Sequence, residues 1–162
     1  MKKLVIVGCG RLAGIVSDAV VNGLLPEYDL VGVYSRTAEK AERIVAKMQQ
    51  HGKTCMACTT IEDLLALKPD YLVEAASPAA MKEFALPALK NGTSIVTLSI
   101  GALADTAFYQ EVMKTAQANG TRVYIVSGAT GGFDVLRTAS LMGNATAKFF
   151  NEKGPNALKG TA

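Results

Sequence analysis

Residues 3–14, KLVIVGCGRLAG, decide the fold. The apolar run before Gly8 is typical of a buried strand, and apolar residues recur at helical spacing from Leu12 onward. Between them, residues 8–13 fit the pattern G-x-G-x-x-A. The first glycine of that pattern permits a tight turn, the second lets a pyrophosphate approach the backbone, and the small third residue lets the helix pack on the strand. The stretch therefore predicts a dinucleotide site with the pyrophosphate at the N-terminus of the helix.

Two other interpretations of this turn stay open. A methyltransferase that binds S-adenosylmethionine has a similar first turn, and a glycine-rich turn can also serve no ligand. The preceding strand, the following helix and a second strand at the spacing of a βαβ unit favour the dinucleotide.

Outward from this stretch, apolar strands alternate with helices. The pattern predicts strands at 3–8, 29–35, 53–58, 70–76, 93–99 and 121–128, and helices at 11–23, 36–52, 60–67, 78–92 and 104–120. Continuous apolar strands separated by helices indicate a parallel sheet covered on both faces. We therefore expect an α/β protein with a doubly wound parallel sheet, the Rossmann fold.

Several helix ends can also be predicted. Thr37 is the expected N-cap of the second helix, and Thr60 and Asp63 have the spacing of a capping box. Pro87 lies inside the fourth helix and is expected to bend or interrupt it.

The pattern changes after Gly128. Residues 129–144 suggest a loop and one helix, and residues 145–151 a short strand. We expect a cofactor-binding domain at 1–140, and at 141–162 the first strand of a truncated second domain. An unpaired strand edge in that tail favours a homo-oligomer, most simply a dimer.

Composition excludes several kinds of partner. The 162 residues carry a net charge of +3, which is too mild to indicate nucleic acid. No apolar run reaches the roughly 20 residues of a membrane span. Three cysteines without a signal-peptide pattern predict a reducing, cytoplasmic location.

The end of the second strand bears on the choice of dinucleotide. A site for NAD has Asp or Glu at this point, whereas this chain has Ser35-Arg36-Thr37. Arg36 can pair with a 2′-phosphate and lie against adenine, which favours NADP over NAD. The alternative is that Arg36 is only a solvated loop residue.

Small residues end the next three strands, in EAASPAA (74–80), SIGALAD (99–105) and SGATGG (127–132). Ligands lie off the carboxyl ends of strands in such sheets, so these ends are expected to line one cleft. Ordinary loop glycines are the alternative explanation.

These strand ends, in this order after a G-x-G-x-x-A turn, resemble the aspartate dehydrogenase family, and FNEKGPNALKGT (150–161) resembles the opening of that family's second domain. The resemblance implies oxidation of L-aspartate to iminoaspartate with NAD or NADP. It also implies a cofactor site made of Gly8, Gly10, Arg11, Leu12, Ala13, Ser35, Arg36, Thr37, Ala76, Ser77, Pro78, Ser99, Gly101, Ala102 and Ala129.

The family's catalytic histidine belongs to its second domain, so no catalytic residue is assigned. His51 ends a surface helix, and Cys55 and Cys58 lack further ligands for a metal, so we expect no metal site. Asp105 is the expected start of a helix. A minor possibility is substrate contact by Asp134, Lys148 or Lys153.

Two functions follow. The first is the cofactor-binding part of an aspartate dehydrogenase, which takes an amino-acid substrate only when a catalytic domain is supplied. The second is a non-catalytic NADP(H)-binding module that regulates a partner.

Overall fold

The computed structural model describes residues 1–126, 133–143, 146, 148, 150 and 152. Contacts divide the chain into two units, residues 1–126 and residues 127–162. The expected domain boundary at residue 140 stays a prediction.

The first unit is built on a sheet of six parallel strands in the order β3-β2-β1-β4-β5-β6. The strands are β1 (Lys2–Val7), β2 (Tyr28–Tyr34), β3 (Met56–Cys58), β4 (Tyr71–Glu74), β5 (Ser94–Thr97) and β6 (Val123–Ile125). The strand order changes direction between β1 and β4, which confirms the predicted doubly wound sheet and places its switch point there.

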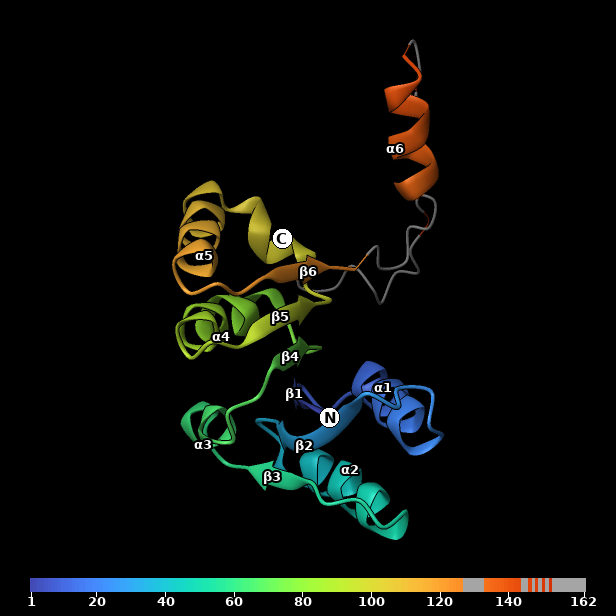
Figure 1. Ribbon diagram of the computed structural model, residues 1–162, viewed down its shortest axis with the longest axis vertical. Helices are drawn as coiled ribbons and strands as arrows, with labels where there is room; N and C mark the ends of the chain where they lie inside the picture. The colour runs from blue at the N-terminus through green and yellow to red at the C-terminus, as the bar shows by residue number, and fades with distance from the viewer. Residues whose placement is uncertain (127–132, 144–145, 147, 149, 151, 153–162) are drawn as a thin grey trace. The chain divides into compact units, whose positions relative to one another are not determined.

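Helices cover both faces of the sheet. Figure 1 shows helices on each side of the strands. The first face carries α1 (Arg11–Val21) and α2 (Ala38–Gln50), and the second carries α3 (Ile61–Ala66), α4 (Pro78–Lys90) and α5 (Thr106–Ala118). A 3-10 helix, η1 (Ile100–Ala104), joins β5 to α5.

The second unit contains α6 (Phe133–Leu141), within the region where one helix is expected. The strand expected at residues 145–151 lies largely outside the described residues.

Strand β1 is apolar from Leu4 to Val7, where both of its faces are buried. Val5 and Val7 belong to the hydrophobic cluster formed with α3, α4 and α5. Leu4 and Ile6 belong to the cluster formed with α1 and α2. A strand in the middle of a parallel sheet therefore needs a continuous apolar run, which is the pattern that the sequence shows.

The helix ends agree with the sequence in part. Thr60 caps α3 by accepting a hydrogen bond from the Asp63 amide at 3.1 Å, as expected. Thr37 occupies the N-cap position of α2, but its side chain makes no capping bond. Its amide instead donates to Ser35 Oγ at 3.2 Å. The sequence identified the position but not the bond.

Pro87 does not interrupt α4, which runs as one helix from Pro78 to Lys90. Buried residues lie on both sides of the proline, with Phe84 before it and Leu89 after it. Their burial against the sheet stabilises the helix more than the one hydrogen bond that proline removes.

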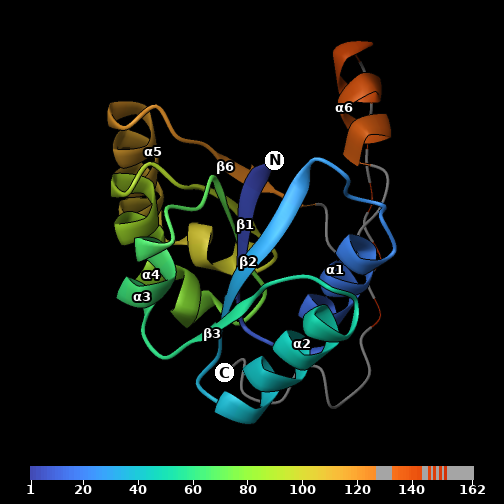
Figure 2. The same ribbon diagram turned by 60° about the horizontal axis from the view of Figure 1, so that its bottom comes forward.

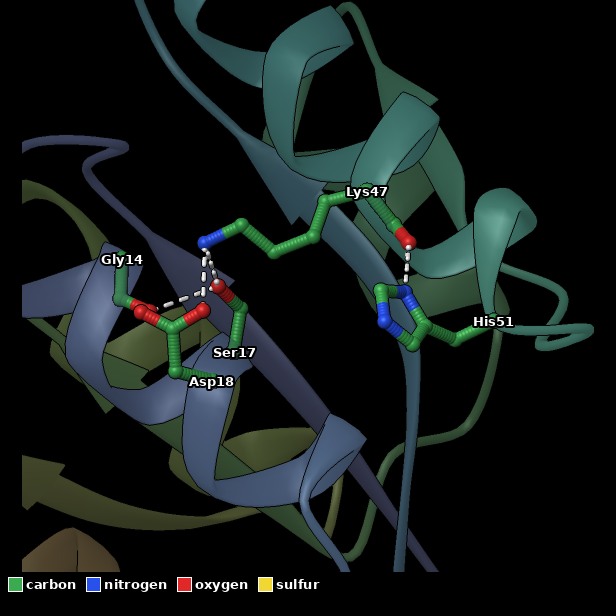
Figure 3. A network of polar contacts seen from close by, with 5 residues as sticks. All are labelled: Gly14, Ser17, Asp18, Lys47 and His51. Atoms are coloured by element: carbon green, nitrogen blue, oxygen red, sulfur yellow. Dashed lines mark hydrogen bonds and ion pairs between the residues drawn. The ribbon is translucent and has the colours of Figure 1, made fainter.

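A polar network joins α1 to α2 (Figure 3). Lys47 Nζ forms an ion pair with Asp18 Oδ1 at 2.7 Å and also donates to Ser17 Oγ at 3.3 Å. The Ser17 hydroxyl donates in turn to the Gly14 carbonyl. Figures 1 and 2 show the two helices side by side. The network therefore holds α1 and α2, the helices that follow β1 and β2, in a fixed position relative to each other.

Candidate functional site

A cleft of about 290 Å³ opens at the carboxyl ends of β1, β2 and β4. These strands flank the switch point of the sheet, where ligands of doubly wound proteins bind. The turn after β1, the loop after β2, the loop after β4 and residues of α2 and α4 line it. The lining residues are Val7, Gly8, Cys9, Gly10, Tyr34, Ser35, Arg36, Thr37, Lys40, Ala75, Ala76, Ser77, Ala79, Ala80, Glu83 and Phe84.

Gly8 begins the turn after β1 with a φ of +90°, a conformation that L side chains rarely adopt. A Cβ atom on Gly8 would also lie 2.7 Å from the Ala75 carbonyl oxygen and from Ala76 Cα. The turn after β1 and the loop after β4 therefore touch through bare backbone at this point.

Gly10 is exposed and has no atom within 4 Å of the place where a Cβ would lie. It occupies the N-cap position of α1, and no side chain caps this helix. Ala13, the small third residue of the pattern, lies on the buried face of α1 and is fully buried. The open space above Gly10 and the uncapped helix start together suit a pyrophosphate.

The loop after β2 supplies polar and positive groups to the cleft. Ser35 is half-buried, and Arg36 and Thr37 are exposed. Lys40 lines the same cleft four residues after Arg36, in the first turn of α2. Sequence reasoning missed Lys40, although its helical spacing from Arg36 was a usable signal. The one carboxylate among the lining residues, Glu83, comes from α4 and not from this loop.

The cleft has an aromatic part. The rings of Tyr34 and Phe84 meet edge to face, with their centroids 5.6 Å apart, and both residues line the cleft.

The loop after β4 brings Ala76 and Ser77 to the cleft. Ser77 also caps α4, because its hydroxyl accepts a hydrogen bond from the Ala80 amide at 3.1 Å. Pro78 is the first residue of α4 and is not among the lining residues.

The remaining predicted cofactor residues lie elsewhere or cannot be placed. Arg11 and Leu12 begin α1 and are exposed outside the cleft lining. Ser99, Gly101 and Ala102 follow β5 and do not line it either, and Ala102 is buried in the core. Ala129 lies outside the described residues. A role for these residues in binding stays a prediction.

Glu74, at the end of β4, is the residue that sequence reasoning missed most clearly. Its side chain is fully buried. Its carboxylate accepts hydrogen bonds from the amides of Ala76 and Ser77 at 2.8 and 3.0 Å, and from Ser99 and Thr97. The usable signal was an acidic residue directly after a buried apolar strand.

His51 and Asp105 have structural roles. His51 is exposed, and its Nδ1 lies 2.9 Å from the Lys47 carbonyl at the end of α2 (Figure 3). Asp105 caps α5 by accepting from the amides of Ala107 and Phe108, which confirms its expected place at a helix start. The side chain of Asp134 and the whole of Lys153 lie outside the described residues, and Lys148 is exposed.

The three cysteines are free and buried among apolar residues. Burial raises the pKa of Cys9 to about 11 and the pKa of Cys55 to about 12. Thiols of this kind are mostly protonated near neutral pH and behave as small apolar groups.

The described residues show neither a membrane-spanning helix nor a cluster of metal-ligating side chains. None of their helices is long and apolar enough to cross a membrane. Within the same part of the chain, no three His, Cys, Asp or Glu side chains gather as a metal site would require.

Solved structures share this fold. Aspartate dehydrogenase from Thermotoga maritima superposes with a TM-score of 0.61, covering 86% of this chain and 51% of that chain at 24% identity. GenD2 from gentamicin A biosynthesis, solved in complex with NAD, gives a TM-score of 0.67, covering 88% and 39% at 17% identity.

Curated relatives are similar over most of this chain. The L-aspartate dehydrogenase of Methanocaldococcus jannaschii is 34% identical in an alignment of 145 positions, which covers 87% of this chain and 51% of the relative. That of Acinetobacter baylyi is 30% identical over 161 residues, which are 99% of this chain and 58% of the relative. The chain thus spans between about half and three fifths of the length of these relatives.

A protein family matches most of the first unit, from the glycine turn to the end of the sheet. Residues 8–126 match the family described as "Homoserine dehydrogenase, NAD binding domain". The match begins at the first glycine of the turn and ends one residue after β6. The chain therefore belongs to this family of NAD-binding domains.

Proposed function

We propose that this chain is the cofactor-binding part of an oxidoreductase of the L-aspartate dehydrogenase type. In the complete enzyme, a hydride would pass from the amino-bearing carbon of L-aspartate to NAD(P)+, with NADP+ preferred. The observation that supports cofactor binding most is the contrast between Gly8 and Gly10. Gly8 has no room for a side chain, whereas Gly10 faces open space at the mouth of the cleft. The named relatives supply the substrate class.

The cofactor would lie along the cleft from the loop after β2 to the loop after β4. Residues 8–13 would hold the pyrophosphate, and residues 35–37 the ribose that carries adenine. Ala76, Ser77 and Pro78 would adjoin the nicotinamide, as would Ser99, Gly101, Ala102 and Ala129. When bound, the nicotinamide ring supplies a hydride acceptor.

The preference for NADP rests on Arg36 and Lys40. Both are exposed residues of the cleft lining, and the loop that carries Arg36 contributes no carboxylate to the cleft. A guanidinium binds a phosphate with two parallel hydrogen bonds, and a carboxylate would repel it. NAD would fit the same cleft with lower affinity because it lacks the 2′-phosphate.

Titration with NADPH and with NADH tests this proposal. We expect tighter binding of NADPH, and we expect Arg36→Ala to weaken NADPH binding by about tenfold or more. NADH affinity should change much less. Arg43→Ala is the matched control, since Arg43 is exposed on α2 but lines no part of the cleft. Equal losses for both variants would contradict a specific phosphate contact. Tighter binding of S-adenosylmethionine would support the methyltransferase interpretation.

An activity assay separates the two functions. The C-terminal half of an L-aspartate dehydrogenase relative is supplied as a separate polypeptide, and oxidation of L-aspartate is measured. Restored turnover supports the dehydrogenase. Tight cofactor binding without restored turnover favours the non-catalytic NADP(H)-binding module. A chain that binds neither dinucleotide contradicts both functions.

A cytoplasmic homo-oligomer belongs to the same proposal. Among the described strands, β6 is at an edge of the sheet, and Tyr124 and Ile125 on it are exposed. Edge strands of this kind favour pairing with another chain. The three free thiols suit a reducing compartment.

A further inference from the structure

Glu74 is an unusual residue at the centre of the sheet. In register it lies between Val7 of β1 and Thr97 of β5. It is the one charged residue among the buried residues of the described part of the chain. Within that part, neither of the two ion pairs involves it. A buried carboxylate without a cation is costly unless hydrogen bonds satisfy its oxygens.

The hydrogen bonds of Glu74 come from the loops that follow two neighbouring strands. Oε1 accepts from the amides of Ala76 and Ser77 and from Ser99 Oγ at 3.0 Å. Oε2 accepts from Thr97 Oγ1 at 2.9 Å and from the Ser99 amide at 3.1 Å. One side chain thus joins the loop after β4 to the loop after β5.

This carboxylate fixes backbone that lines the cleft. The amides of Ala76 and Ser77 point to Oε1, and both residues line the cleft beside Gly8. At the Gly8 turn the approach is already so close that a Cβ atom would lie 2.7 Å from Ala76 Cα. A small shift of residues 75–77 would therefore change the space between the two loops.

We propose that Glu74 is a positioning residue for the bound dinucleotide. Its buried carboxylate holds the loops after β4 and β5 in the arrangement that receives the nicotinamide half. This inference rests on the proposed function, because it concerns the same cleft. An apolar residue would fill the volume as Val7 does, but it would leave the amides of residues 76, 77 and 99 without this acceptor.

Binding of a whole dinucleotide and of half of one can be compared to test this role. The ligands are NADPH and 2′,5′-ADP, which contains the adenosine end and lacks the nicotinamide end. Calorimetric titration uses the full chain and its Glu74→Gln variant. Glutamine keeps the size of the side chain but replaces one acceptor oxygen with an NH2 donor. At least one backbone N–H of the two loops then loses its acceptor. We expect NADPH to bind about tenfold more weakly and 2′,5′-ADP to bind within about twofold of the wild type.

A pair of threonine variants provides the control. Thr97→Val removes the hydrogen bond to Oε2 at the carboxyl end of β5. Thr93→Val removes an equally buried hydroxyl just before β5, where it donates to the Pro69 carbonyl at 2.9 Å. We expect Thr97→Val to weaken NADPH binding by about threefold and Thr93→Val to leave it unchanged.

The outcomes separate this inference from the proposed function. A Glu74→Gln chain that binds NADPH as tightly as the wild type overturns the inference, as does a parallel loss of 2′,5′-ADP. If Glu74→Gln does not fold, the threonine pair decides, and equal NADPH affinities for the two variants overturn the inference. A wild-type chain that binds neither dinucleotide overturns the proposed function itself.

Discussion

Gly8 and Gly10 stand two residues apart in one turn and are glycine for opposite reasons. At Gly8 the backbone conformation and the nearby loop both exclude a side chain. At Gly10 the protein leaves space for one. Gly8 is therefore needed for the fold, whereas Gly10 leaves room for a ligand in the cleft.

We expect Gly8→Ala to destabilise the fold by about 2–4 kcal/mol. Strain at a positive φ and overpacking against the Ala75 carbonyl and Ala76 both contribute. Urea unfolding measures the loss. A change smaller than about 1 kcal/mol would mean that the two loops separate easily.

Gly10→Ala is the matched variant and should behave in the opposite way. Its φ of −85° is accessible to alanine, and no atom lies near the added methyl group. We expect stability within about 0.5 kcal/mol of the wild type. NADPH binding should weaken by about tenfold, because the methyl group occupies the space that the pyrophosphate needs. Unchanged NADPH binding would show that no pyrophosphate lies against Gly10.

The residues whose roles could be predicted from the sequence are those that depend on their near neighbours. The glycine turn, the Thr60 cap and the Asp105 cap each depend on a few adjacent positions. The partners of Glu74 could not be found in this way, because Thr97 and Ser99 approach it only through the pairing of β4 with β5.

Among the elements, α5 offers the clearest electrostatic test. Its N-cap, Asp105, forms an ion pair with Lys82 of α4 at 2.7 Å. The hydrogen bond from Lys82, followed by the Phe108 amide, lowers the pKa of Asp105 below its ordinary value of 3.8. The ion pair therefore links two helices on the same face of the sheet.

The sign of the pH effect follows from this lowered pKa. Asp105 adds stability above the ordinary pKa of 3.8, and this contribution is lost as the pH falls through the lower pKa of the folded state. Asp105→Asn keeps a good N-cap residue but loses the ion pair. We expect the variant to be slightly less stable than the wild type at neutral pH and equally stable in acid.

Urea unfolding at several values between about pH 2 and pH 7 measures this difference. The pKa of Asp63 is also lowered, mainly by a hydrogen bond with Thr60. Its contribution to stability is therefore lost in acid in the wild type and in the Asp105→Asn variant alike. It therefore cancels from the comparison. A difference in stability that stays constant across the pH range would contradict the role of the Asp105 charge.

Most helices and strands could be predicted from the sequence, because each has its own hydrophobic periodicity. Which of them contribute residues to the cleft could not be predicted. The small residues Ser99, Gly101 and Ala102 correctly indicated that a strand ends before them. They do not line the cleft, because β5 lies one strand farther from the switch point than β4. The sequence indicates where a strand ends, but it does not indicate how many strands separate that strand from β1 in the sheet.

At the scale of the whole chain, the first unit contains all the residues proposed to hold the adenosine end of the cofactor. The six strands and both described hydrophobic clusters lie within residues 1–126. The glycine turn and residues 35–40 lie there as well. Ala129 is the predicted cofactor residue beyond this unit, so the two ends of the dinucleotide can be tested separately.

We expect a chain ending at Val126 to fold with one cooperative transition and to bind 2′,5′-ADP within about twofold of the full chain. If Ala129 contacts the nicotinamide half, the same truncation should weaken NADPH binding by about threefold or more. Circular dichroism melting and calorimetric titration measure the two effects. Equal NADPH binding by the two chains would remove Ala129 from the site. Loss of the cooperative transition would mean that residues 127–162 are needed for the first unit to fold.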